Sequence, residues 1–139
     1  MIARIRKNLE HKDQGFTLIE LLVVMVIIGI LAAVAIPVFL NQRKKAEDTA
    51  AKNDVSNLGK EIATFWVDGT AMPNVVASAG RYYVDFQDSG AQSTNVVLGG
   101  ASGTTATDWC VWVLNSEGDV AASPGFEYSA QSGLQSGSC

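Results

Sequence analysis

The chain has 139 residues, enough for one small domain but not for two, and its formal net charge is −4. Residues 1–15 hold four basic and two acidic side chains, so residues 16–139 carry six basic and twelve acidic ones. An acidic body lacks the basic surface that binding to a phosphate backbone requires, and we expect no nucleic-acid partner.

Two N-terminal segments differ sharply in polarity. Residues 1–15 form a polar, mostly basic leader peptide, whereas residues 16–40 form an almost continuous apolar run. As a helix these 25 residues extend about 37 Å, which exceeds the hydrocarbon core of a bilayer at roughly 30 Å. The pattern predicts a transmembrane helix over residues 16–40, weakened at Gly29 and at Pro37.

The helix is predicted to continue beyond residue 40 as an amphipathic segment. Apolar residues recur there at spacings of three to five, with polar residues between them: Ala46, Ala50, Val55, Leu58, Ile62 and Phe65. That spacing predicts one buried stripe. Asp68-Gly69 and Met72-Pro73 are stop signals, so we expect the helix to run from Phe16 to about Val67.

Short β-strand patterns and small polar loops fill the remainder of the chain. The predicted strands are Arg81–Gln87, Thr94–Leu98, Trp109–Leu114, Asp119–Ala122 and Phe126–Ser129. Trp109–Leu114 is apolar on both faces, as in a central strand, and a turn at 115–118 predicts its hairpin with Asp119–Ala122.

The predicted fold class is therefore α+β. A long N-terminal helix, half transmembrane and half amphipathic, carries a small antiparallel sheet packed on its C-terminal half. The globular domain, residues 41–139, would consist of the amphipathic helix half, about 41–67, and the sheet and loops, 68–139.

Two cysteines, Cys110 and Cys139, both lie far from the apolar run. In an exported domain the simplest expectation is that they form one disulfide, and two free thiols are the alternative. Closing a loop of about 30 residues would restrict the unfolded chain by roughly 3–4 kcal/mol in the loop-entropy account. It would also hold a C-terminal segment that has little to bury.

Glu20 is a lone carboxylate near the start of the apolar run. A charge at mid-span costs about 2.5–3.5 kcal/mol, and less near the interface, so Glu20 calls for a partner. No basic side chain lies between Lys12 and Arg43. Cleavage after Gly15 would create a new α-amino group on Phe16, on the same chain or on a neighbouring one. Such a pair can fix the axial register between subunits.

The sequence GFTLIE at 15–20, followed by the apolar run that ends at Pro37, resembles the N-terminal segment of type IV pilins and pseudopilins. The resemblance is close from residue 15 to about residue 45 and architectural beyond. It implies that a membrane aspartic protease, the prepilin peptidase, cuts between Gly15 and Phe16 and methylates the new amine. It also places Gly29 and Pro37 where filaments of that family show a locally melted helix.

The resemblance implies a structural subunit of a type IV pilus, a homo-oligomeric helical filament built by a pilus assembly machinery. Residues 16–40 would pack against one another in the filament, with Phe16 and Glu20 as assembly residues. The precursor would cross the cytoplasmic (inner) membrane once with its body outside, and the mature form would stand in an extracellular filament on the cell surface.

Several alternatives stay open. A type II secretion pseudopilin is the nearest one; the cysteine pair favours a pilin, since pseudopilins often carry calcium-binding loops instead. A monomeric membrane-anchored surface binding protein or a simple one-pass anchor also explains the span. An ordinary secretory signal with a cleavage site near Ala33-Val34-Ala35 is disfavoured by the length of the apolar run.

No catalytic site, cofactor or metal is predicted. The single histidine, His11, lies in the leader, so a chain cut after Gly15 would lack the usual neutral-pH general base. Two acid pairs, Asp85 with Asp88 and Glu117 with Asp119, could attract calcium weakly, but solvated turn residues explain them better.

Overall fold

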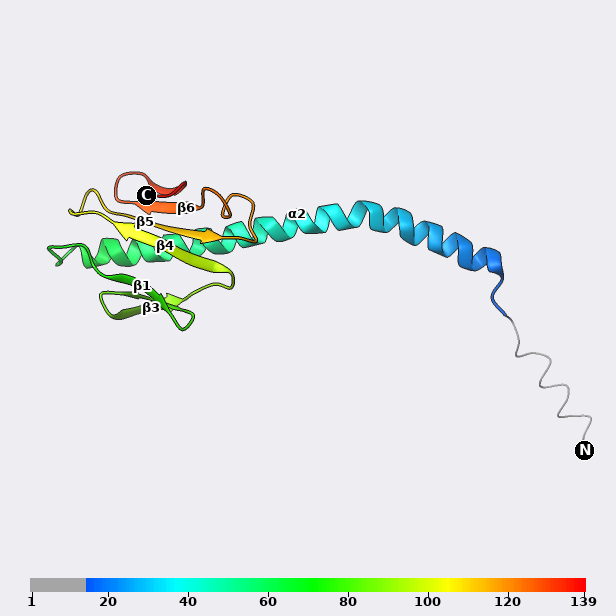
Figure 1. Ribbon diagram of the computed structural model, residues 1–139, viewed down its shortest axis with the longest axis horizontal. Coiled ribbons are helices and arrows are strands. Elements are labelled where there is room, and N and C mark those ends of the chain that lie inside the picture. The colour runs from blue at the N-terminus through cyan, green and yellow to red at the C-terminus, as the bar shows by residue number, and fades with distance from the viewer. Residues whose placement is uncertain (1–14) are drawn as a thin grey trace, which may run out of the picture. The chain divides into compact units, whose positions relative to one another are not determined.

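The computed structural model describes residues 15–139, so the predicted leader lies outside the described residues except for Gly15. The chain divides into two units, Met1–Phe39 and Leu40–Cys139. The helix α2 (Leu18–Phe65) belongs to both units (Figure 1). The long N-terminal helix predicted from the sequence is thus confirmed, and it ends two residues before the expected Val67.

Local signals account for both ends of α2. Thr17 stands immediately before its first residue and caps it, while the N–H of Gly69 closes the last turn by donating to the carbonyl of Phe65 at 2.9 Å. Between these ends the chain stays helical at Gly29 and carries Pro37 inside the helix. Any break at these two positions would therefore belong to the assembled filament, which remains a prediction.

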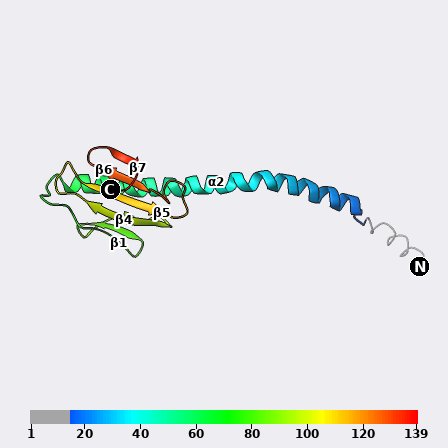
Figure 2. The same ribbon diagram turned by 45° about the horizontal axis from the view of Figure 1, so that its top comes forward.

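In the second unit, two antiparallel sheets accompany the helix (Figures 1 and 2). The three-stranded sheet has the order β1 (Val75–Ser78), β2 (Arg81–Val84), β3 (Gln87–Ala91). The four-stranded sheet has the order β4 (Val96–Ser102), β5 (Cys110–Asn115), β6 (Phe126–Ser129), β7 (Gly133–Ser136). The strands β1 and β4 also contact each other, so the two sheets adjoin through these strands. The α+β class is confirmed, with two sheets in place of the single one expected.

The core lies between α2 and the sheets. The buried stripe of α2 includes Val55, Leu58 and Ile62, as the spacing predicted. Its partners come from four of the strands and two loops: Tyr82, Val84, Val96, Trp109, Val111, Val113, Ala121 and Phe126. Each fully buried aliphatic side chain contributes roughly 1.5–3 kcal/mol, so this stripe holds the body together.

The helix α2 packs closely on the sheet at Gly59, and no larger residue would fit at this position. A Cβ at Gly59 would overlap the ring of Tyr128 on β6. That ring in turn stacks on Trp109, with 6.1 Å between the ring centroids. The glycine, which weakens the helical pattern in the sequence, therefore has a packing role.

The predicted strand Arg81–Gln87 is wrong in part, because it contains a turn. Asp85 and Phe86 have φ angles of 49° and 66°, so β2 ends at Val84 and the chain folds back into β3. Val84 pairs with Gln87 across the hairpin, so these two residues share one face, and the alternation seen in the sequence ends at Val84.

The predicted hairpin strand Asp119–Ala122 is also wrong. The backbone N–H groups of residues 119–121 donate to the carboxylate of Asp48 on α2, so they are not available to a sheet. The antiparallel partners of β5 are β4 and β6, which confirms the strand predicted at Phe126–Ser129 and the central place of β5. The strands β1, β3 and β7, which lie at sheet edges, were not predicted.

Candidate processing and assembly site

The Gly15–Phe16 junction lies in non-helical chain directly before α2. Residues 15–17 are exposed, and the side chain of Phe16 is 88% exposed. A Cβ built at Gly15 would meet nothing within 4 Å. An exposed, non-helical peptide bond with a glycine on its N-terminal side is the kind of bond that a protease can take into an extended active-site cleft.

Thr17 and Glu20 form a reciprocal cap on the first turn of α2. The N–H and the hydroxyl group of Thr17 both donate to Oε2 of Glu20 at 2.9 Å, and the N–H of Glu20 donates to Oγ1 of Thr17 at 3.3 Å. This is the capping box, in which the spacing Thr-x-x-Glu satisfies helix donors that have no partner in the helix. Sequence reasoning missed this role of Thr17, although the spacing is visible in the sequence.

The cap uses one carboxylate oxygen of Glu20 and leaves the other to accept a hydrogen bond from another partner. Its Oε2 is engaged by Thr17, whereas its Oε1 accepts no hydrogen bond within residues 15–139. The same carboxylate can therefore cap its own helix and accept one more donor. Phe16 contributes no hydrogen bond to Glu20 among these residues.

The first unit exposes its apolar residues on every side of the helix. Leu18, Ile30 and Val34 are 88%, 63% and 67% exposed, respectively. An 18-residue window in α2 is long and apolar enough to cross a membrane, and none of it is buried, which makes it a candidate membrane span. Large contiguous apolar surfaces of this kind mark a site of contact with lipid or protein.

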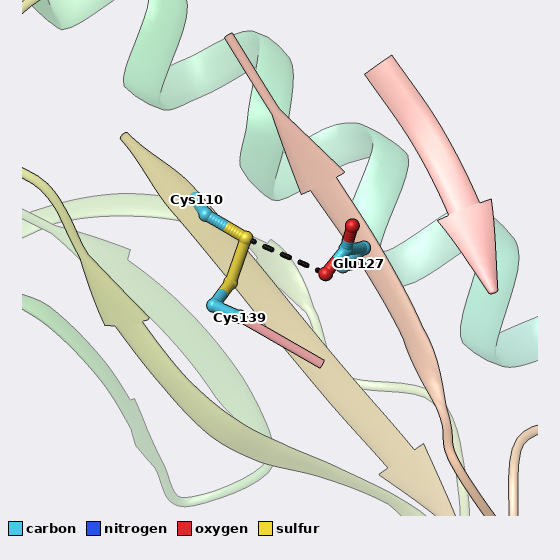
Figure 3. A group of neighbouring side chains, drawn as sticks. All are labelled: Cys110, Glu127 and Cys139. Carbon is cyan, nitrogen blue, oxygen red and sulfur yellow. Dashed lines mark hydrogen bonds between the residues drawn. A yellow bond between two sulfur atoms is a disulfide. The ribbon is translucent and has the colours of Figure 1, made fainter. Parts of the chain in front are cut away.

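The predicted disulfide between Cys110 and Cys139 is present (Figure 3). Cys110 opens β5, and Cys139 follows β7, with Cα atoms 5.8 Å apart. The bond thus ties the segment after an edge strand to the centre of the sheet. Oε2 of Glu127 on β6 lies 3.8 Å from Sγ of Cys110 (Figure 3), a contact without a hydrogen bond because a disulfide sulfur carries no proton.

Within residues 15–139, His, Cys, Asp or Glu side chains converge in a group of three at one place. This group consists of Cys110, Glu127 and Cys139. The sulfur atoms of the two cysteines are bonded to each other in the disulfide, so they are not available to a metal ion. Of the acids considered from the sequence, Asp88 is held by Arg81, whose Nε and Nη2 donate to it at 2.6 and 2.8 Å. These bonds, and one from the N–H of Gly90, lower the pKa of Asp88.

Comparisons with known proteins agree with the N-terminal geometry. Residues 11–36 match the family described as "Prokaryotic N-terminal methylation motif". The chain is 38% identical over 64 residues to type II secretion system core protein G of Pseudomonas aeruginosa. The aligned segment covers 46% of this chain and 45% of that protein. Proteins of the same name from five further sources are 31% to 37% identical.

Two other relatives carry pilus names. The fimbrial protein EcpB of Eikenella corrodens is 36% identical over 80 residues, 58% of this chain and 44% of that protein. The type IV major pilin protein PilA of Myxococcus xanthus is 47% identical over 47 residues, 34% of this chain and 21% of that protein. The matches thus span about half or less of the length of each relative described. No solved structure matches.

The N-terminal segment thus combines a match to the methylation motif with an exposed Gly-Phe junction and a capped apolar helix, and a small α+β body follows it. More particularly, the similarities fit the family of pilins and pseudopilins, so the resemblance seen in the sequence is confirmed. Because type II secretion core protein G from six sources is among the similar proteins, the pseudopilin alternative is at least as well supported as the expected pilus subunit.

Proposed function

We propose that the chain is a structural subunit of a pilin-type helical filament, made as a membrane-anchored precursor and cut after Gly15. The observation that carries the proposal is the apolar helix surface of the first unit, exposed on every side. One face of a helix can be covered by its own domain, but a helix that is apolar all round needs lipid or neighbouring helices. Lipid covers the precursor, and neighbouring copies cover the mature chain.

Glu20 acts in this proposal as the register-setting residue. When the helix leaves lipid, its carboxylate pairs with the new α-amino group of Phe16 on a neighbouring copy. Oε1 of Glu20 accepts a hydrogen bond from the amine while Oε2 keeps its bonds to Thr17. The carboxylate can therefore pair with the amine without breaking the cap. A charge pair shielded from water is specific in its geometry even where its net stabilisation is small.

Two forms of filament are candidates, and a secretion pseudopilus is the first. Its support is the similarity to type II secretion core protein G from several bacteria. A surface pilus is the second, supported by the similarity to EcpB and PilA and by the disulfide near the C-terminus. Both forms use the same processing and helix packing.

The processing step is tested by mass spectrometry of the exported chain, where we expect an N-methylated Phe16 as the first residue. A different first residue would overturn the proposal. Shearing of cells, sedimentation and electron microscopy then separate the two forms. A pilus predicts long sheared filaments of this chain, whereas a pseudopilus predicts few filaments and a secretion defect when the gene is deleted. A processed chain that stays monomeric would refute both.

A further inference from the structure

The turn between β2 and β3 presents an aromatic side chain to solvent. Its two central residues, Asp85 and Phe86, both have positive φ, and Phe86 is 80% exposed. Hairpin turns of this kind favour Asn-Gly, because a positive φ is sterically unfavourable for a residue with a bulky side chain. Phe86 gains little burial within its own chain in return. An exposed and conformationally strained aromatic residue therefore calls for a partner outside the chain.

A groove near β7 has the shape and chemistry to receive it. The groove has a volume of about 410 Å³ and is lined by Lys52, Val120, Phe126, Leu134, Gln135 and Ser136. Nζ of Lys52 stands 4.9 Å from the centroid of the Phe126 ring, so a cation and an apolar wall share one site. Such a site suits an aromatic residue that follows an acidic one, as Phe86 follows Asp85.

Two other grooves of the body are less suitable. The groove beside the turn itself is lined by Glu61 and Asp68, which would repel an incoming Asp85. The groove between Trp66 and Trp109 has no charged lining residue and a smaller volume, about 270 Å³. Charge complementarity thus selects the groove that contains Lys52.

The turn and the Lys52 groove belong to opposite ends of the paired sheets. Because β1 contacts β4, the strand sequence runs from β3 through the two sheets to β7 (Figures 1 and 2). The turn lies at the β3 end, and the groove lies at the β7 end. Two different surfaces at opposite ends form a heterologous contact, which repeats from copy to copy and generates an open helix.

We propose that the Asp85–Phe86 turn of one copy docks into the Lys52 groove of the next copy. The Phe86 ring packs against the exposed side chain of Leu134, and the Asp85 carboxylate pairs with Lys52. This inference rests on the proposed filament function and adds a contact between the globular bodies to the packing of the apolar helices.

Photo-crosslinking of assembled filaments tests the contact directly. The full-length chain is produced with p-benzoylphenylalanine in place of Phe86 and irradiated. We expect covalent dimers whose crosslinked peptide includes residues 120–136 of the second copy. The same photoreactive residue in place of Val67, which is 78% exposed and lies two residues beyond the end of α2, serves as the control and should not reach those residues.

A charge exchange provides an independent test. Asp85→Lys and Lys52→Asp should each lower the yield of filaments about tenfold, and the double variant should recover most of it. Melting temperatures within a few degrees of wild type would exclude unfolding as the cause. Filaments that crosslink elsewhere, or a double variant no better than the singles, would overturn the docking but leave the filament function intact. If the processed wild-type chain stays monomeric, the proposed function fails as well.

Discussion

The buried carboxylate of Asp54 on α2 accepts a hydrogen bond from the hydroxyl group of Tyr82 on β2, at 2.9 Å. The same carboxylate accepts bonds from the N–H and the hydroxyl group of Ser93, at 2.8 and 2.7 Å. Ser93 lies in the connection between β3 and β4, where the chain passes from one sheet to the other. Asp54 therefore joins the helix to the junction of the two sheets.

Asp54→Ala should lower the free energy of unfolding of the body by about 2–4 kcal/mol, because it leaves buried donors of Tyr82 and Ser93 without an acceptor. Asp68→Ala, at an exposed position beyond the end of α2, is the matched control and should change it little. Thermal unfolding of the detergent-solubilised chain, followed by near-UV circular dichroism, measures both. Equal melting temperatures for the two variants would contradict the role of Asp54.

Asp48 holds the β5–β6 connection in a similar way. Oδ1 accepts from the N–H groups of Asp119 and Ala121 at 2.9 Å, and Oδ2 accepts from that of Val120 at 3.2 Å. Asp48→Ala should raise the amide exchange rates of residues 119–121 and lower the free energy of unfolding by about 2–3 kcal/mol. Asp48→Asn, which retains one acceptor oxygen, should have a smaller effect. Unchanged exchange at residues 119–121 would show that the connection is held by other contacts.

Asp108 provides a pH-dependent prediction in the loop before β5. Its carboxylate accepts from the N–H and hydroxyl groups of Thr104 and Thr105, and these bonds lower its pKa to about 2. The unfolded pKa is about 3.9, so the loop's stabilisation is fully present above pH 4 or so and is lost as the pH falls through about 2. The amide resonances of both threonines should shift across that interval. Asp108→Asn should abolish the shift, and a midpoint near 4 would contradict the prediction.

The disulfide should stabilise the body by about 2–4 kcal/mol. The double variant Cys110→Ser with Cys139→Ser should melt at a lower temperature and show faster amide exchange in β7. Exchange in β1 should change less, because β1 lies in the other sheet. The reduced wild-type chain is the matched control and should behave like the double variant. Equal protection of β7 in all three would show that the strand needs no crosslink.

Two substitutions at Glu20 separate its charge from its capping role. Glu20→Ala should leave membrane insertion and cleavage largely intact but sharply reduce assembly. Glu20→Gln keeps an acceptor for the Thr17 cap but loses the charge, so it should assemble as poorly as the alanine variant. Shear fractions probed with an antibody to the chain measure assembly. Normal filament yield from the glutamine variant would contradict a pairing with an amine.

Sequence patterns predicted the helix because its apolar residues follow one period over a long stretch, and Val55, Leu58 and Ile62 are buried as that period requires. The same patterns could not identify Asp48 and Asp54 as buried. A carboxylate is expected at the surface, because its burial costs free energy unless hydrogen-bond donors surround it. For Asp48 and Asp54 these donors come from distant parts of the chain. Those donors lie 39 to 73 residues away along the chain, apart from Tyr82 at 28.

Strand prediction was weakest at the sheet edges and turns. β7 contains Gly133 and β1 has a mostly exposed burial pattern, so neither has the apolar alternation of a half-buried strand. At the candidate site, Gly15, Phe16 and Glu20 were identified by a short motif that leaves little ambiguity. Their roles in cleavage and assembly remain predictions, whereas the cap by Thr17 became evident only from the hydrogen bonds.

The close packing of Gly59 beneath Tyr128 reverses a common rule of helix engineering. Alanine normally favours a helix over glycine by about 1 kcal/mol, yet here its methyl group would collide with an aromatic ring. Substitution at this site should separate α2 from β6 and so loosen the body as a whole. In the evolution of this chain, position 59 is therefore closed to every other amino acid unless residue 128 becomes smaller at the same time.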